Sequence, residues 1–129
     1  MFSLGKDQLI SAKPIPPGKY LLEITEYTEA LSKAGDSTNY TFEFAVQDEK
    51  YTGKVIKKLW NEKALDKAIP DAVNSLESLL SSCGIHTAEG GVFDGNKLKG
   101  KQVFGFVTLE KSSDSKSTFN GIESFAPAA

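Results

Sequence analysis

The hydrophobic period of this chain changes twice, and the order of those changes limits the folds that it can adopt. Segment 70–83 repeats at helical spacing, with Pro70 where a first-turn proline is tolerated and Gly84 where a helix commonly ends. On either side, apolar residues recur at every second position, as in half-buried strands. The strand-like segments are 18–27, 39–47, 54–60, 102–111 and 118–127. We therefore expect three meandering strands, one helix and a final hairpin, with Asn61 capping a short extra turn before the helix.

This order of elements predicts an all-β protein with one helix. It matches a five-stranded Greek-key OB-fold barrel in which the helix lies between strands 3 and 4 and covers one end of the barrel. A split β-sandwich, or an SH3-like barrel with a helical insert, fits the order less well. We expect an extended N-terminal arm over residues 1–17, the OB-fold domain over 18–126 and a short tail over 127–129.

Length and composition fit a single globular domain. A chain of 129 residues can bury a core without disulfides, and its single cysteine, Cys83, excludes an internal disulfide. The N-terminal stretch has no basic region followed by an apolar run, and no segment suggests a membrane span. We therefore expect a cytoplasmic protein, in the host cytoplasm if a phage encodes it.

The distribution of charge is more informative than its sum. A net charge of −2 argues against nucleic acid as a ligand, because phosphate contacts need cations. The lysines, however, gather in segments 50–67 and 97–101, whereas many of the acids lie elsewhere. All 15 basic residues are lysines. Lysine can hold a phosphate backbone but lacks the planar fork with which arginine reads base edges, so any nucleic-acid binding should show weak sequence preference.

Residue patterns for catalysis or metal binding are missing. The chain has one histidine, His86, with no aspartate at a spacing that suggests a triad. Together with Cys83 it falls short of the ligands that zinc needs. The glycines do not form a phosphate loop, because the GK[ST] element after a strand is missing. The sequence therefore predicts neither an enzyme nor a cofactor or metal site.

The third strand, "KVIKKLW", carries the features that binding of single-stranded nucleic acid requires, namely cations for the backbone and aromatic faces for the bases. We expect the face that carries Lys54, Lys58 and Trp60 to be exposed to solvent, while Val55 and Leu59 pack the strand against the barrel. The groove would cross strands 2 and 3 between the loops that join strands 1–2 and 4–5. The expected DNA-binding residues are Lys33, Lys54, Lys57, Lys58, Trp60, Lys111 and Lys116.

The aromatic residues leave alternatives open. Trp60 can stack on a base or close the barrel core, and a large aromatic side chain favours burial. Phe104 and Phe106 share one face of the fourth strand and are either packed under the helix or exposed to bases. Tyr27 and Tyr51 are the other candidates for base stacking.

Four segments resemble, in order, those of a phage family of single-stranded-DNA-binding proteins with a small OB-fold: "IPPGKYLLEITEYTEA", "YTFEFAVQDEKYTGKVIKKLW", "SLESLLSSCGI" and "KLKGKQVFGFVTLEK". The resemblance implies protection and presentation of single-stranded DNA in replication or recombination, with replication or recombination proteins as partners. It implies a DNA path over Lys54, Lys57, Lys58 and Trp60. Lysines replace the arginines often seen in such grooves, and the tail "SFAPAA" lacks an acidic tip for recruiting partners. Self-association is left open.

A different class of function fits the same fold. In a small β-barrel module that binds proteins, such as a virion or adaptor component, the aromatic residues would form the core and the lysines would be solvated. The two hypotheses differ in one feature. DNA binding requires the face of Lys54, Lys58 and Trp60 to be exposed and continuous with Lys33 and Lys116.

Overall fold

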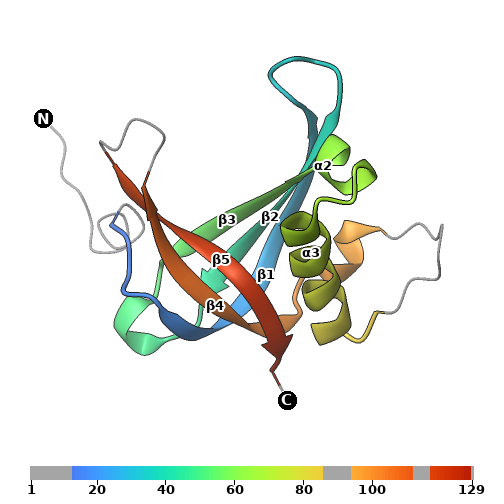
Figure 1. Ribbon diagram of the computed structural model, residues 1–129. Helices are drawn as coiled ribbons and strands as arrows, with labels where there is room; N and C mark the ends of the chain where they lie inside the picture. Colours follow the sequence, from blue (N-terminus) through green and yellow to red (C-terminus); the bar gives the residue numbers. More distant parts are fainter. Residues whose placement is uncertain (1–12, 86–93, 112–116, 129) are drawn as a thin grey trace, which may run out of the picture.

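The computed structural model describes residues 13–85, 94–111 and 117–128 and contains one five-stranded antiparallel sheet (Figure 1). The strands are β1 (Gly18–Leu31), β2 (Thr38–Val46), β3 (Val55–Asn61), β4 (Gln102–Lys111) and β5 (Thr118–Pro127). The helices are α2 (Glu62–Asp66) and α3 (Pro70–Ser82), and the 3₁₀ turns are η1 (Glu49–Tyr51) and η2 (Gly95–Leu98). The predicted class, all-β with one main helix between the third and fourth strands, is confirmed.

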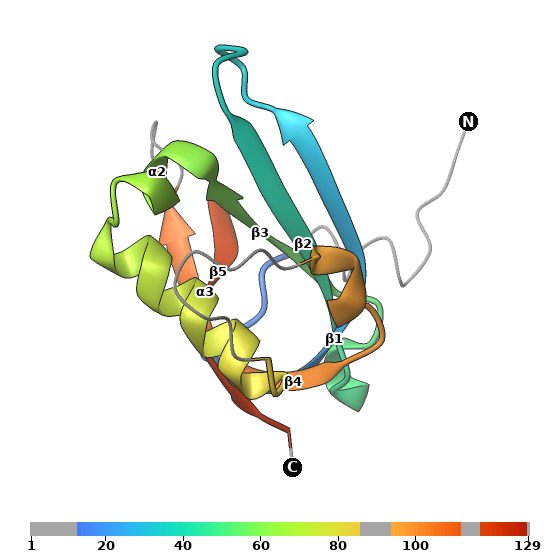
Figure 2. The same ribbon diagram turned by 90° about the vertical axis from the view of Figure 1, so that its right-hand side faces the viewer.

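The strands lie in the order β3-β2-β1-β4-β5. The sheet coils, so that parts of β3 and β5, its two edge strands, have Cα atoms within 8 Å of each other. Among the described residues no β-ladder joins these two strands, so the sheet is open along this boundary, which we call the seam. The β1–β2 hairpin extends beyond the other strands (Figure 2). In the described residues, β3 and β5 therefore do not close the sheet into a hydrogen-bonded barrel.

Helix α3 lies against β5 on the inner face of the sheet (Figures 1 and 2). Pro70 occupies its first turn and Gly84 follows its end with φ of 76°, a conformation that glycine adopts without strain. Leu79 and Leu80 are buried against the sheet. Upstream, the Asn61 side chain accepts a hydrogen bond from the backbone N–H of Lys63 and caps α2, as predicted.

The face of β3 that carries Lys58 and Trp60 points to the inside of the sheet, whereas the sequence predicted that it is exposed to solvent. In the antiparallel register, Lys58 is paired with Phe42 and Ile56 with Phe44. Directly opposed residues in such a pair point to the same side of the sheet. Both phenylalanines are fully buried, so Lys58 and Ile56 point inward with them. The expectation that Leu59 holds this strand to the core is wrong, because its side chain is 51% exposed.

A buried side-chain amide helps to fix the segment before β1 to the sheet. Asn120 of β5 accepts a hydrogen bond from the Ile15 backbone N–H at 2.8 Å. Its Nδ2 atom donates to the Ile15 carbonyl at 2.9 Å and to the Thr108 carbonyl at 3.1 Å. Ile15 itself packs into the core and is 3% exposed. The last residues of the expected N-terminal arm thus belong to the packed domain.

We predict that Asn120→Ala lowers the free energy of unfolding by about 1–3 kcal/mol, because it leaves the buried Ile15 N–H and C=O groups without partners. Urea denaturation of the variant and the wild type measures the difference. Asn74→Ala, at an exposed position of α3, is the matched control and should change stability little. Equal effects of the two substitutions would contradict the anchoring role.

Candidate nucleic-acid interface

Two phenylalanines and a lysine meet on the outer face of the sheet, where β1 pairs with β4. Lys19 is the cross-strand partner of Phe106, and Leu21 that of Phe104. The Lys19 Nζ atom lies 4.5 Å from the Phe104 ring centroid and 5.9 Å from that of Phe106. Phe106 is 38% exposed and Phe104 is half-buried. We call Lys19, Phe104 and Phe106 the aromatic platform, and of the two alternatives for these rings the outward one is confirmed.

The strand between these rings is held close to its neighbour by a glycine. Gly105 faces inward between Phe104 and Phe106, and a Cβ atom there would overlap the Leu22 side chain of β1. The inner positions Val103 and Val107 are buried, so the alternation of β4 directs both rings outward. The result is an outward-facing pair of aromatic rings with the Lys19 ammonium over them, a combination that can stack bases and contact a phosphate.

Trp60 belongs to the core. Its side chain is 2% exposed and its ring packs edge-on against Phe42 at 5.7 Å between centroids. The indole Nε1–H donates to the Ala72 carbonyl at 3.1 Å and to Ser75 Oγ at 3.0 Å, both in α3. Of the two alternatives for Trp60, the core position is confirmed and the expected exposure is wrong, because the ring is buried and tethers β3 to the helix.

The lysines expected to act together on β3 are divided between the two faces of the sheet. Lys54 is buried, and its Nζ donates to the Lys13 carbonyl at 3.1 Å, so its expected exposure is wrong. Lys57 is exposed on the outer face, in a cross-strand row with Glu43 and Glu26 that carries more negative than positive charge. The Lys58 side chain is partly buried and points inward.

The remaining predicted lysines lie in or near the loops. Lys33 is exposed in the β1–β2 loop, whose Asp36 forms an ion pair with Lys63 of α2. Lys111 is exposed at the end of β4, and Lys116 lies outside the described residues.

Neither predicted tyrosine belongs to the platform. Tyr27 points to the inner side, with its ring 4.7 Å from that of Phe42, and η2 covers it so closely that a Cβ atom at Gly95 would overlap the ring. Tyr27 therefore lies away from the platform, and its role in stacking stays a prediction. Tyr51 is half-buried and packs edge-on against Tyr20 at 5.9 Å, and its role in stacking stays a prediction.

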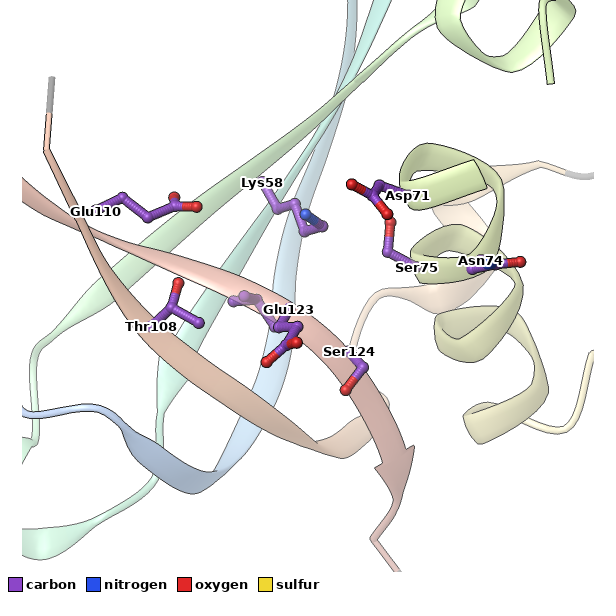
Figure 3. A pocket seen from close by; sticks show the side chains of 9 residues that line it. Lys58, Asp71, Asn74, Ser75, Thr108, Glu110, Glu123 and Ser124 are labelled. Atoms are coloured by element: carbon purple, nitrogen blue, oxygen red, sulfur yellow. The ribbon is translucent and has the colours of Figure 1, made fainter. Parts of the chain in front are cut away.

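A cavity of about 650 Å³ opens at the seam (Figure 3). It is bounded by β3, by the first turns of α3 and by β4 and β5. Burial lowers the pKa of the Lys58 ammonium in this cavity, and the nearby Glu110 carboxylate opposes the shift. We call this cavity the seam pocket. The residues that give it its chemistry are Lys58, Asp71, Ser75, Glu110, Glu123 and Ser124.

Residues 3–129 match a protein family of unknown function, DUF669. The chain belongs to this family. A comparison of this DUF669 protein with curated proteins gives no significant match. Within the described residues, no helix is both long and apolar enough to span a membrane.

Two features of the DUF669 protein were missed by sequence reasoning. Lys19 shares a face of β1 with Leu21, but only the pairing of β1 with β4 brings it to Phe104. The carboxylates of the seam pocket come from three elements, and no local pattern connects them. Glu123 is the extra residue of a β-bulge, since the register passes from Ser124 to Ile122.

We predict that the Trp60 fluorescence of the DUF669 protein has a blue-shifted maximum and is weakly quenched by acrylamide, because the indole is buried and hydrogen-bonded inside. The chain has one tryptophan, so the emission spectrum reports on this position alone. A Stern–Volmer comparison with the urea-unfolded protein measures its protection. Equal quenching of the folded and unfolded protein would contradict the burial.

We predict that Tyr27 ionises later than an exposed tyrosine. Burial, and then the charge of Glu29, raise the pKa of Tyr27 to about 12 from 10.0. Because the folded pKa is raised, the stabilising contribution is complete below pH 10 and is lost as pH rises toward 12. Absorbance titration at alkaline pH measures the phenolate, and Tyr27→Phe should remove the latest step. An unchanged titration curve in this variant would contradict the assignment.

Proposed function

We propose that this protein binds single-stranded DNA, largely irrespective of sequence, by stacking bases on the aromatic platform. The observation that carries the proposal is the Lys19 ammonium beside the rings of Phe104 and Phe106 on the outer face. Stacking on aromatic rings contributes about 1–3 kcal/mol per base and tolerates every base, because each has a π-face. Lysine without arginine favours backbone contact over base readout.

We take the fold to be an OB-fold, the barrel of many single-strand binders. Its support is the strand order β3-β2-β1-β4-β5, the approach of β3 to β5 and the position of α3 between β3 and β4. The proposed DNA path differs from the groove expected over β2 and β3. On that surface, Glu43 stands between Lys57 and Glu26 and would repel a phosphate backbone.

We place this activity in phage DNA replication or recombination, on the resemblance of the chain to phage single-strand binders. Such a protein protects single strands and presents them to replication or recombination proteins. With few cations at the platform, binding depends more on stacking than on counterion release. The salt dependence should accordingly be shallower than that of proteins with many phosphate contacts.

A second candidate function is binding to another protein. Its support is the exposure of two leucines on the β1–β3 part of the sheet, Leu31 at 72% and Leu59 at 51%. Exposed apolar side chains of this size are a common feature of protein interfaces. A virion or adaptor component would bind its partner through this surface and not through the aromatic platform.

We predict that Phe104→Ala and Phe106→Ala each weaken binding of a fluorescein-labelled thymidine 16-mer by roughly fivefold or more, as loss of one stacking contact implies. Fluorescence anisotropy at low salt measures the affinity, and a double variant should bind more weakly than either single one. Lys19→Met should weaken binding and reduce the slope of log affinity against log salt concentration.

Phe119→Ala is the matched control, because Phe119 is 48% exposed on β5 and lies outside the platform. It should bind like the wild type. Thermal unfolding of each variant checks that the fold is intact. If the folded wild type does not bind the oligonucleotide at low salt, the proposal fails and protein binding through Leu31 and Leu59 becomes the function to test.

A further inference from the structure

The seam pocket carries an amphoteric set of groups that the proposed stacking does not use. Lys58 lies between carboxylates that come from different elements, Asp71 of α3, Glu110 of β4 and Glu123 of β5 (Figure 3). Ile122, which is 3% exposed, adds an apolar wall. A volume of about 650 Å³ is ample for one nucleobase.

The Lys58 ammonium has no carboxylate partner in the described part of the chain, where no ion pair within 4.0 Å involves it. Its Nζ atom lies over the Trp60 ring, 5.1 Å from the centroid. This contact keeps the ammonium at the pocket while leaving its donors directed to solvent or a ligand. A half-buried cation in this setting favours a ligand that presents a hydrogen-bond acceptor.

The carboxylates favour a ligand that also presents donors. Among the described residues, no group of three or more metal-ligating side chains is placed to hold a metal ion. Gly121 leaves room for the Glu110 carboxylate, which a Cβ atom at that position would overlap. The β-bulge turns the Glu123 backbone out of the ladder and leaves this residue without a cross-strand partner.

The pocket adjoins the aromatic platform. Ser124 lines the pocket and is the cross-strand partner of Phe106 on β4. Lys19, Phe106 and Ser124 thus form one row across three strands of the outer face. Neighbouring strands lie about 4.8 Å apart, so a strand of DNA stacked on Phe106 needs to move only one nucleotide to bring the next base to the pocket.

We propose that the seam pocket is a base-binding subsite that prefers guanine, with Lys58 donating to its O6 and N7 atoms and Glu110 or Glu123 accepting from N1–H and N2–H. Guanine alone presents two adjacent donors beside an acceptor, and a carboxylate accepts both donors at once. A phosphate is disfavoured there, since three carboxylates oppose one ammonium. The inference rests on the proposed binding of single-stranded DNA and adds a base preference to it.

The test compares labelled dT16 with d(TG)8, d(TC)8 and d(TI)8 by fluorescence anisotropy, where I is deoxyinosine, whose base lacks the N2 amino group of guanine. A base contact contributes about fivefold where guanine occupies the pocket, and half of the registers place it there. We therefore expect d(TG)8 to bind about threefold more tightly than dT16. The d(TC)8 oligonucleotide should lose this preference, whereas d(TI)8, whose base keeps O6, N7 and N1–H, should lose only the part that N2–H contributes.

Lys58→Met, Glu110→Gln and Glu123→Gln should reduce the ratio of d(TG)8 to dT16 affinity toward one. Lys57→Met and Glu77→Gln change the same charges at exposed positions outside the pocket and should leave the ratio unchanged. Thermal unfolding confirms that each variant is folded before its ratio is used.

The outcomes separate the subsite from the proposed function. Binding of dT16 with no gain for d(TG)8, or with an equal gain for d(TC)8, would overturn the guanine subsite and leave single-strand binding standing. A preference that survives in all three pocket variants would also overturn it. Failure to bind any of the oligonucleotides would overturn the proposed function itself.

Discussion

The cross-strand pairing of Phe42 on β2 with Lys58 on β3 determines which side chains of β3 point inward at the seam. Because opposed residues of an antiparallel pair share a face, burial of the phenylalanine carries the lysine inward with it. The same register sends Trp60 under α3, where its indole N–H donates to Ser75 and joins the strand to the helix. A slip by one residue would exchange these side chains for Lys57 and Leu59 and would place a charge in the centre of the core.

An inward lysine at this position has consequences for closure of the sheet. A full β-ladder between β3 and β5 would exclude water from Lys58. Burying an unpaired ammonium in this way costs several kcal/mol. The open seam keeps the charge hydrated, and the bulge at Glu123 bends β5 beside it. The polar pocket and the missing ladder between β3 and β5 therefore have the same physical cause, the inward-pointing ammonium of Lys58.

The period of the sequence was enough to predict the strands, the helix and their order, because alternation and helical spacing are local signals. It was not enough for β3, where Lys54, Ile56, Lys58 and Trp60 on one side are no more apolar than Val55, Lys57 and Leu59 on the other. The clean alternation of β2 around Phe42 held the missing information, but only through the register. The alternation of β4 predicted that Phe104 and Phe106 share one face but left open which face it was. The burial of Val103 and Val107 in the structure places the two rings outside. The pocket depends on a bulge and on the meeting of β3 with β5, which are tertiary features.

An overall negative charge does not prevent a strand of DNA from lying on the platform, because electrostatic interactions in salt are local. Lys19 and Glu26 stand seven residues apart on β1, which at about 3.3 Å per residue is roughly 23 Å. The screening length at physiological ionic strength is about 8 Å, so the acidic row of Glu26 and Glu43 scarcely acts on a phosphate beside Lys19. Two stacked bases at about 1–3 kcal/mol each then outweigh a single lysine–phosphate contact. Aromatic area rather than net charge is accordingly the quantity that sets affinity in a lysine-only protein of this kind.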